Sequence, residues 1–168
     1  MSKLRPMSES DLELVLQWRN HPEVRRYMYT THEIRLEEHR KWFSGASVNP
    51  EIDLLIFERE EKPQGFVNLT RTRCNLVADW GFYLAPDAKK GTGRELGISA
   101  LNFAFEQLGL HKVCGQALGF NERSIAFHQR LGFLQEGCFR DQHYDGERFH
   151  DVVCFGLLKS EWQAQSKD

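Results

Sequence analysis

The sequence lacks the closely spaced cysteine and histidine pairs that metal sites and disulfide frameworks require. Its four cysteines contain no C-x-x-C pair, and its seven histidines form no H-x-x-x-H or H-E-x-x-H pattern. Widely spaced thiols of this kind are typical of a reducing compartment. We therefore expect four free thiols (Cys74, Cys114, Cys138 and Cys154), no metal ion and a cytoplasmic protein.

A large net charge and long apolar runs are also absent from the sequence. The 22 Lys and Arg residues balance 24 Asp and Glu residues, giving a net charge of -2 and no general attraction to nucleic acid or to an anionic membrane. The longest apolar runs, such as residues 53–57, are too short to span a bilayer. Residues 1–18 lack the apolar core of a secretory signal. The sequence predicts neither a nucleic-acid partner nor a membrane.

What the sequence does contain is typical of a globular domain. Apolar residues make up 40% of it, aromatic residues 12% and charged residues 27%, which excludes disorder. We find no internal repeat, low-complexity tract or linker. Since a domain has roughly 150 residues, residues 1–168 are expected to form one domain.

Hydrophobic spacing predicts a mixed α/β (α+β) architecture. Three- and four-residue spacing of apolar positions predicts helices over residues 10–20, 22–28, 36–43, 93–108 and 121–131. Apolar and β-branched segments predict strands over residues 52–58, 65–73, 77–84 and 112–118, and a final hairpin of 134–140 with 148–158. The tail over 159–168 allows a short helix or a frayed end. These elements predict a single, mostly antiparallel sheet flanked by helices.

The segment over residues 84–94 joins a predicted strand to a long predicted helix through a basic, glycine-containing turn. Gly91 and Gly93 let backbone N–H groups converge, and a helix N-terminus carries partial positive charge. Together they favour a site for a pyrophosphate, although the segment is neither a Walker A loop nor a G-x-G-x-x-G fingerprint. A solvated helix-capping loop would have the same sequence.

A second informative segment covers residues 121–133. Asn121, Ser124 and His128 share one face of the predicted helix, because they are three and four residues apart. This polar stripe is typical of a binding or catalytic face. The alternative is structural, with Asn121 as a helix cap and His128 as a half-buried histidine.

Together the two segments resemble the signature regions of the GCN5-related N-acetyltransferases, known as GNATs. The order of predicted elements also resembles the GNAT fold over nearly the whole chain. The resemblance implies an acetyl-CoA-dependent N-acetyltransferase, with acetyl-CoA as co-substrate. Its implied cofactor-binding residues are Tyr83, Leu84, Ala85, Lys89, Lys90, Gly91, Thr92, Gly93, Arg94, Asn121 and Ser124.

Two positions depart from the GNAT pattern. Ala88 stands where the family's loop has Gln or Arg, which removes one side-chain contact. His128 stands where the family has a tyrosine that protonates the leaving CoA thiolate. An imidazole can donate a proton near neutral pH, so His128 is the predicted acid or a placeholder at that position.

The first third resembles a narrower group, the nucleotide-sugar N-acetyltransferases of pseudaminic acid biosynthesis. The segments over residues 18–25 and 28–39 carry this resemblance. It implies transfer to the 4-amino group of a UDP-4-amino-4,6-dideoxy-N-acetyl-β-L-altrosamine, whose product feeds flagellin glycosylation. The substrate-binding candidates are Arg19, Met28, Tyr29, His39, Thr70, Arg71 and Tyr83. Each also has an ordinary structural alternative, such as an ion pair for Arg19 or core packing for Tyr83.

The expected chemistry is direct transfer, in which the neutral amine attacks the acetyl carbonyl and backbone N–H groups hold the oxyanion. The predicted catalytic residues are His128, Asn121, Ser124 and Gln116. Gln116 stands where relatives often have a strand carboxylate, and an amide cannot act as a base. The sequence therefore does not identify a general base.

Two other functions stay open. One is acetylation of a protein N-terminus, as in ribosomal-protein N-acetyltransferases, because the W-R-N segment over residues 18–20 occurs in those relatives as well. The other is a non-catalytic CoA-binding module, which the departures at Ala88, Gln116 and His128 would suit. The sequence does not decide the oligomeric state, and a homodimer is one option.

Overall fold

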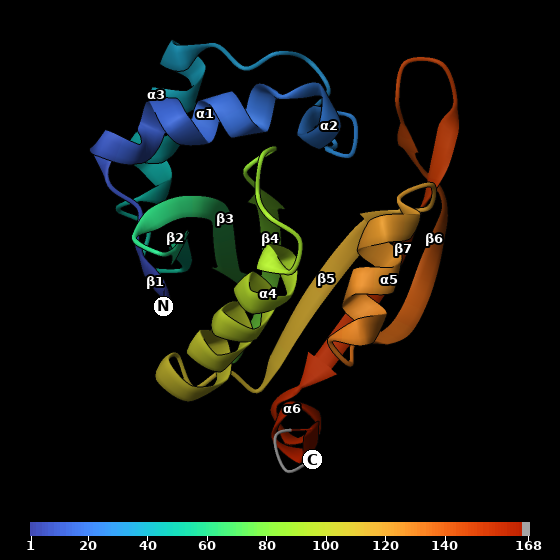
Figure 1. The fold of residues 1–168 in the computed structure, drawn as a ribbon. Helices are drawn as coiled ribbons and strands as arrows, with labels where there is room; N and C mark the ends of the chain where they lie inside the picture. The colour runs from blue at the N-terminus through green and yellow to red at the C-terminus, as the bar shows by residue number, and fades with distance from the viewer. Residues whose placement is uncertain (166–168) are drawn as a thin grey trace. The chain divides into compact units, whose positions relative to one another are not determined.

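The computed structural model describes residues 1–165 (Figure 1). These residues form two compact units. The first consists of Met1–Thr70 with Gly81–Ala100, and the second consists of Arg71–Trp80 with the described residues from Leu101 onward. The prediction of one domain over residues 1–168 stays a prediction. Of the tail over 159–168, residues 166–168 lie outside the described part.

The first unit begins with a strand and a group of helices. Its N-terminal elements are β1 (Ser2–Pro6), η1 (Glu9–Asp11), α1 (Leu12–Asn20), α2 (Pro22–Arg25) and α3 (Leu36–Ala46). The apolar face of α1 is buried as its spacing predicts, with Leu12, Val15 and Trp18 in the core of this unit. The three predicted helices are confirmed. Strand β1 was missed, since its five residues alternate too little to stand out.

Three strands of the first unit pair side by side. They are β1, β2 (Ile52–Arg59) and β3 (Lys62–Arg71), and both pairings are antiparallel. The Glu60 and Glu61 residues of the β2–β3 turn have positive φ angles of 53° and 62°. Glu60 donates its backbone N–H to the Met1 carbonyl at 3.0 Å, which ties this turn to the start of β1. The predicted strands at 52–58 and 65–73 are confirmed, with β3 shifted toward the N-terminus.

Three elements carry the chain from the first unit into the second or back. Strand β3 has its last residue, Arg71, in the second unit, and strand β4 (Val77–Leu84) and helix α4 (Thr92–Asn102) also cross a unit boundary. The predicted helix over 93–108 is correct in its first part. Its last turn widens into a short π-helical segment, η2 (Phe103–Gln107), before Gly109 with φ +66°.

The second unit is built on an antiparallel β-hairpin. Its elements are β5 (Lys112–Leu118), α5 (Glu122–Arg130), β6 (Leu134–Tyr144), β7 (Phe149–Leu158) and α6 (Lys159–Gln165). Strand β7 pairs with both β5 and β6, and the β6–β7 hairpin extends into an open tip (Figure 1). Strand β6 is longer than predicted because pairing resumes at His143 after a bulge.

The strand order is β1-β2-β3-β4-β5-β7-β6. Strand β4 pairs with β5 in parallel, while β1–β2, β2–β3, β5–β7 and β6–β7 are antiparallel. The predicted fold class, a mixed and mostly antiparallel sheet flanked by helices, is confirmed. The parallel ladder covers Val77–Asp79 and Lys112–Cys114, although both strands continue beyond it.

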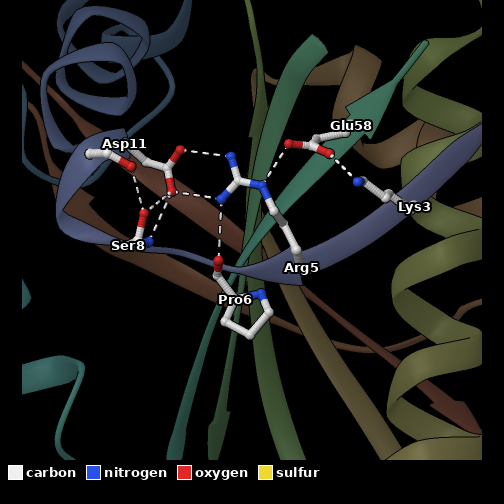
Figure 2. A network of polar contacts seen from close by, with 7 residues as sticks. Lys3, Arg5, Pro6, Ser8, Asp11 and Glu58 are labelled. Atoms are coloured by element: carbon white, nitrogen blue, oxygen red, sulfur yellow. Dashed lines mark hydrogen bonds and ion pairs between the residues drawn. The ribbon is translucent and has the colours of Figure 1, made fainter. Parts of the chain in front are cut away.

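A buried ionic cluster holds the N-terminal strand to the start of the helical segment (Figure 2). The Arg5 guanidinium donates to both carboxylate oxygens of Asp11 at 2.8 Å and to Glu58 Oε1 at 2.6 Å. The Asp11 side chain is 7% exposed and the Glu58 side chain 10%. Hydrogen bonds from Arg5 lower the pKa of both carboxyl groups, so both are ionised at neutral pH.

Replacing Arg5 with Met should destabilise the protein by about 2 kcal/mol at pH 7, because two nearly buried carboxylates lose their counter-ion. The stabilisation that Arg5 gives the two ionised carboxylates is complete above their unfolded-state pKa values of about 4. It is lost as pH falls through the lowered folded-state pKa values. The difference in urea-unfolding free energy between variant and wild type should therefore shrink below about pH 4.

Lys3→Met is the matched control, since Lys3 contacts the same Glu58 at 3.1 Å with a side chain that is 60% exposed. It should change stability by less than about 0.5 kcal/mol. Equal losses of unfolding free energy in the two variants would contradict the role of Arg5 as the main counter-ion of this cluster.

Candidate functional site

The predicted anion-binding loop lies in the first unit, between β4 and α4. Gly91 has φ +92°, a conformation that favours glycine, and a Cβ there would meet open space. Thr92 begins an eleven-residue helix, whose first N–H groups have no partner within the helix. The predicted junction of a glycine turn and a helix start is therefore present, and the binding of an anion there stays a prediction.

The cationic side chains of the loop and of the helix start are exposed. They are Lys89, Lys90 and Arg94, of which Lys89 forms a distant pair with Glu60 at 4.0 Å. Ala88, which replaces the family's polar residue, packs partly buried against the core of the unit. At position 88, apolar packing therefore takes the place of the polar side chain that the family pattern has there.

The helix start is held from within the unit by Arg59 at the end of β2. Its guanidinium donates to the hydroxyl of the fully buried Thr92 at 3.1 Å and pairs with Glu95 at 3.3 Å. Ser2 donates its hydroxyl to the same Glu95 carboxylate at 2.6 Å. Sequence reasoning missed Arg59 and Glu95, because residues so far apart in sequence give no local signal.

The predicted residues at the end of β4 differ in what they can offer a ligand. The Ala85 N–H already donates to the Gln64 carbonyl at 2.8 Å, so it is committed within the protein. Leu84 is half-buried and approaches Gly65. Tyr83 lies against Phe66, with ring centroids 5.0 Å apart, and belongs to a larger cluster.

That cluster brings together three of the predicted substrate-binding residues. Ring contacts run from His39 through Trp42 and Phe66 to Tyr83, with centroid separations of 5.2, 6.0 and 5.0 Å. Arg19 interacts electrostatically with both His39 and Tyr83. We call Arg19, His39, Trp42, Phe66 and Tyr83 the arginine–aromatic cluster.

Two buried polar atoms of this cluster have no hydrogen-bond partner among the described residues, Arg19 Nη1 and His39 Nε2. The other terminal nitrogen of Arg19 donates to the Thr30 carbonyl at 2.8 Å. The other ring nitrogen of His39 is bonded to the Leu12 carbonyl. Because buried polar groups are nearly always paired, these two atoms are candidates for contact with a bound molecule.

Burial sets the charge states of this cluster. It lowers the pKa of His39, with Arg19 adding to the effect, so His39 is neutral at pH 7 and its Nε2 is an acceptor. Burial raises the pKa of Tyr83, which stays a neutral phenol. Burial also lowers the pKa of Arg19, but a guanidinium keeps its proton in any ordinary environment.

The remaining predicted substrate residues are more scattered. Met28 is half-buried, while Tyr29 is 52% exposed next to the Thr30 carbonyl that Arg19 holds. Thr70 is the last residue of the first unit's opening segment, and Arg71 begins the second unit. Both are half-buried at the end of β3.

In the second unit, the polar stripe on α5 is one connected chain of hydrogen bonds. Asn121 caps the helix by accepting the Ser124 N–H at 3.2 Å. His128 Nδ1 lies 2.8 Å from the Ser124 carbonyl and 3.5 Å from the Ser124 hydroxyl. The helical face predicted from the spacing is confirmed, and both structural alternatives, a capping Asn121 and a buried His128, are present at once.

The chain of hydrogen bonds ends on a residue that sequence reasoning did not single out. The indole N–H of Trp80 donates to His128 Nε2 at 3.0 Å. Since Nε2 accepts, Nδ1 carries the proton and donates it to the Ser124 carbonyl. His128 is 1% exposed and stacks on Phe155 at 4.8 Å. Both of its ring nitrogens are therefore engaged within the protein.

This geometry affects the predicted role of His128 as the acid that protonates the CoA thiolate. A proton donor to a thiolate needs an N–H that is free to point at sulfur, and His128 uses its only N–H on a carbonyl. Burial also lowers the pKa of His128, so the ring is neutral at pH 7. His128 is thus a buried histidine with both ring nitrogens hydrogen-bonded within the protein, and its role as the acid stays a prediction.

Gln116, the fourth predicted catalytic residue, lies on the other face of β5. A Cβ on Gly115 would approach His128, so residue 115 faces α5 and residue 116 faces away from it. Gln116 is exposed, and its amide lies 4.0 Å from the Cys154 sulfur. The structure therefore joins Asn121, Ser124 and His128 but does not bring Gln116 to them.

A scan against family models matches residues 3–134 to the acetyltransferase (GNAT) domain. The match covers most of the chain, including the loop before α4 and the stripe on α5. The chain belongs to the GNAT acetyltransferase family.

Two curated acetyltransferases are similar to this chain over different shares of its length. The chain is 37% identical over 92 residues to the Bacillus subtilis protein "Putative ribosomal N-acetyltransferase YdaF", matching 54% of the chain and 50% of that relative. It is 28% identical over 150 residues to the acetyltransferase PseH of Campylobacter jejuni, matching 86% of the chain and 92% of PseH. The chain thus spans about half the length of the first relative and nearly all of the second.

Solved GNAT structures share the fold. Spermidine N-acetyltransferase from Vibrio cholerae, in complex with CoA and spermine, superposes with a TM-score of 0.88 over 96% of this chain and 98% of that chain. The sequence identity is 21%, so the likeness establishes the fold alone.

The cysteines and the absence of a metal cluster complete the description. All four cysteines are free, Cys74 and Cys138 exposed and Cys114 and Cys154 half-buried. Within residues 1–165, no three His, Cys, Asp or Glu side chains gather as they would around a metal ion. The same residues contain no helix long and apolar enough to cross a membrane. The predicted cytoplasmic location stays a prediction.

Gly115→Ala tests the buried pair directly. A Cβ at this position would lie 2.5 Å from His128 Nε2 and 2.7 Å from Trp80 Nε1, so the two rings must separate. We expect a loss of about 1–3 kcal/mol in the free energy of unfolding, measured with urea.

Gly137→Ala is the control on the adjacent hairpin, because a Cβ there meets nothing within 4 Å. It should leave stability nearly unchanged. A tolerated Gly115→Ala would show that the Trp80–His128 hydrogen bond is not formed in solution.

Proposed function

We propose that this chain is an acetyl-CoA-dependent N-acetyltransferase that acts on the 4-amino group of a nucleotide-linked sugar. The proposed acceptor is UDP-4-amino-4,6-dideoxy-N-acetyl-β-L-altrosamine, as in pseudaminic acid biosynthesis. The observation that carries the choice of acceptor is the arginine–aromatic cluster, with Arg19 Nη1 and His39 Nε2 buried and unpartnered. The match to PseH over most of both chains supports it.

The proposed donor site uses the loop before α4. The pyrophosphate of acetyl-CoA is assigned to the backbone N–H groups around Gly91 and Gly93, with Lys89, Lys90 and Arg94 contributing charge. Family membership and the local loop geometry support this assignment. From the GNAT resemblance, Asn121 and Ser124 are proposed to contact the pantetheine, and Tyr83, Leu84 and Thr92 to line the donor site.

The charge of the arginine–aromatic cluster argues for an oxygen-rich acceptor. Arg19 offers a buried cationic N–H, which requires a phosphate, carbonyl or hydroxyl oxygen. A nucleotide sugar supplies such oxygens, and its hydroxyl or amide N–H groups can donate to His39 Nε2. A polyamine supplies only cationic donors, which Arg19 would repel. The fold is shared with a spermidine enzyme, but these residues favour a different acceptor.

The remaining acceptor contacts are assigned by resemblance. Met28 and Tyr29 are proposed to line the sugar pocket, and Thr70 and Arg71 to serve the nucleotide. Tyr29 lies on the segment that Arg19 anchors through Thr30, so its position depends on the same guanidinium.

The proposed reaction needs no covalent enzyme intermediate. The lone pair of the neutral amine forms the new N–C bond, the C–S bond of the thioester breaks, and the amine proton balances the proton gained by the CoA sulfur. Alignment of the bound reactants supplies much of the acceleration. Gln116 cannot accept the proton, and because it lies on the face of β5 away from Asn121, Ser124 and His128 it has no part in the proposed reaction.

An acceptor panel tests the function. Purified protein is incubated with acetyl-CoA and, in turn, the UDP-4-amino-4,6-dideoxy sugar, spermidine and N-terminal ribosomal-protein peptides, and free CoA thiol is measured. We expect turnover with the UDP-sugar and none with spermidine. Turnover with peptides alone would replace the proposed acceptor by the one that the YdaF match favours. Acetyl-CoA binding without any turnover would favour a non-catalytic module.

Arg19→Met tests the acceptor assignment. The variant keeps the aliphatic stem and removes the buried charged donor, which should raise KM for the UDP-sugar by roughly tenfold to a hundredfold. The Kd for acetyl-CoA should not change. Arg25→Met is the control for loss of a nearby cation, since Arg25 also interacts electrostatically with Arg19 but pairs with the exposed Glu33, at 4.0 Å. An unchanged KM in Arg19→Met would contradict the assignment.

Gly91→Ala tests the donor loop. At φ +92° an alanine is strained, so the loop should shift and the Kd for acetyl-CoA should rise by about tenfold. Gly109→Ala carries a similar backbone strain at φ +66° after η2. It should lower thermal stability without changing the Kd, which calorimetry of acetyl-CoA binding would measure.

A further inference from the structure

His128 occupies the position at which the GNAT pattern has its proton-donating tyrosine, yet its surroundings are those of a core residue. Its neighbouring side chains are the rings of Trp80, Phe127, Phe133 and Phe155. None of these titrates near neutral pH. The two influences on its pKa are burial, which lowers it, and the Ser124 carbonyl, which raises it. Burial is the larger of the two influences, so the neutral imidazole is favoured.

The hydrogen bonds around His128 have one direction. Trp80 donates to Nε2, Nδ1 donates to the Ser124 carbonyl, and the Ser124 N–H donates to Asn121 Oδ1. An indole N–H is a donor only, so it fixes Nε2 as the acceptor and selects the Nδ1–H tautomer. The ring therefore links the end of the β4–β5 ladder to the first turn of α5.

Gly115 supplies the space for this link. A side chain at position 115 would occupy the position of the Trp80–His128 hydrogen bond itself. Three residues from three elements, β4, β5 and α5, are thus matched to one another. This match explains why an imidazole can stand at the tyrosine position: it is long enough to reach Trp80 and small enough to lie over glycine.

We propose that His128 is a positioning residue and not the acid, and that Trp80 and Gly115 act with it to hold the N-terminal turn of α5, with Asn121 and Ser124, in place for the donor substrate. The assignment of Asn121 and Ser124 to the donor rests on the proposed function. The hydrogen-bonded state of His128 does not.

The first test is therefore made without substrate. In NMR spectra of isotope-labelled histidine, His128 should show a single Nδ1–H tautomer at neutral pH and should not titrate near the ordinary histidine pKa. Trp80→Phe removes the indole donor and keeps an aromatic ring, and it should restore tautomer exchange at His128. A ring that titrates near its ordinary pKa in the wild type would overturn the proposal.

The second test compares two substitutions of His128 in the acceptor assay. Gln places an amide oxygen near the position of Nε2 and can accept from Trp80, whereas Phe fills the space and cannot. For a positioning role, His128→Gln should keep kcat within about threefold of wild type and His128→Phe should lose at least tenfold. For an acid, both should lose activity equally, and the alkaline limb of the pH profile should disappear in both.

The outcomes separate the two proposals. Absence of turnover in the wild type would refute the proposed acceptor and leave the NMR result to decide the state of His128. Normal turnover with equal losses in His128→Gln and His128→Phe would refute the positioning role and keep the function. Circular dichroism and thermal unfolding of each variant identify a loss of fold, in which case Trp80→Phe provides the same comparison at the donor end of the hydrogen bond.

Discussion

The second unit depends on one buried hydrogen bond, from the Trp80 indole to His128. A polar group in a core is costly unless it is paired. Both ring nitrogens of His128 are paired here, Nε2 with the indole donor and Nδ1 with the Ser124 carbonyl. Because the bond passes over Gly115, it also fixes how closely α5 approaches β5 (Figure 1). Strand, helix and glycine are each required for the others to fit.

The first unit presents the opposite situation. Arg19 and His39 are also buried, yet each keeps one nitrogen without a partner among the described residues. A satisfied buried histidine indicates structure, while an unsatisfied buried pair indicates a missing ligand. The same rule therefore distinguishes two histidines that the sequence offered alike as candidate site residues: His39 keeps an unpartnered nitrogen among the described residues, as the proposed acceptor site requires, whereas both nitrogens of His128 are hydrogen-bonded within the protein.

This distinction also bears on the choice among acceptors. GNAT proteins share a fold while acting on different amines, so the likeness to a spermidine enzyme carries little information about the substrate. The charge of the residues that would face the acceptor is more informative about the substrate. A guanidinium is fixed as a cation, and its buried N–H favours a partner that presents oxygen, as the proposed nucleotide sugar does.

Much of the fold was predictable because it rests on local signals. The spacing of Leu12, Val15 and Trp18 predicted α1, and Asp145-Gly146 predicted the final turn, since each pattern lies within one element. Strand β1 escaped because five residues with a terminal proline carry no clear period. The ionic cluster of Arg5, Asp11 and Glu58 escaped because pairing between distant charges leaves no pattern in the sequence (Figure 2).

The sequence by itself determined the GNAT family, the anion-suited loop before α4 and the shared helical face of Asn121, Ser124 and His128, because these depend on residue type and on spacing within one segment. Only the tertiary structure decided what His128 does with its two nitrogens. Its partners come from β4 and from the helix backbone, and its available space comes from a glycine on β5. A side chain's chemistry depends on which donors and acceptors the fold brings to it, and that information lies in contacts between distant residues.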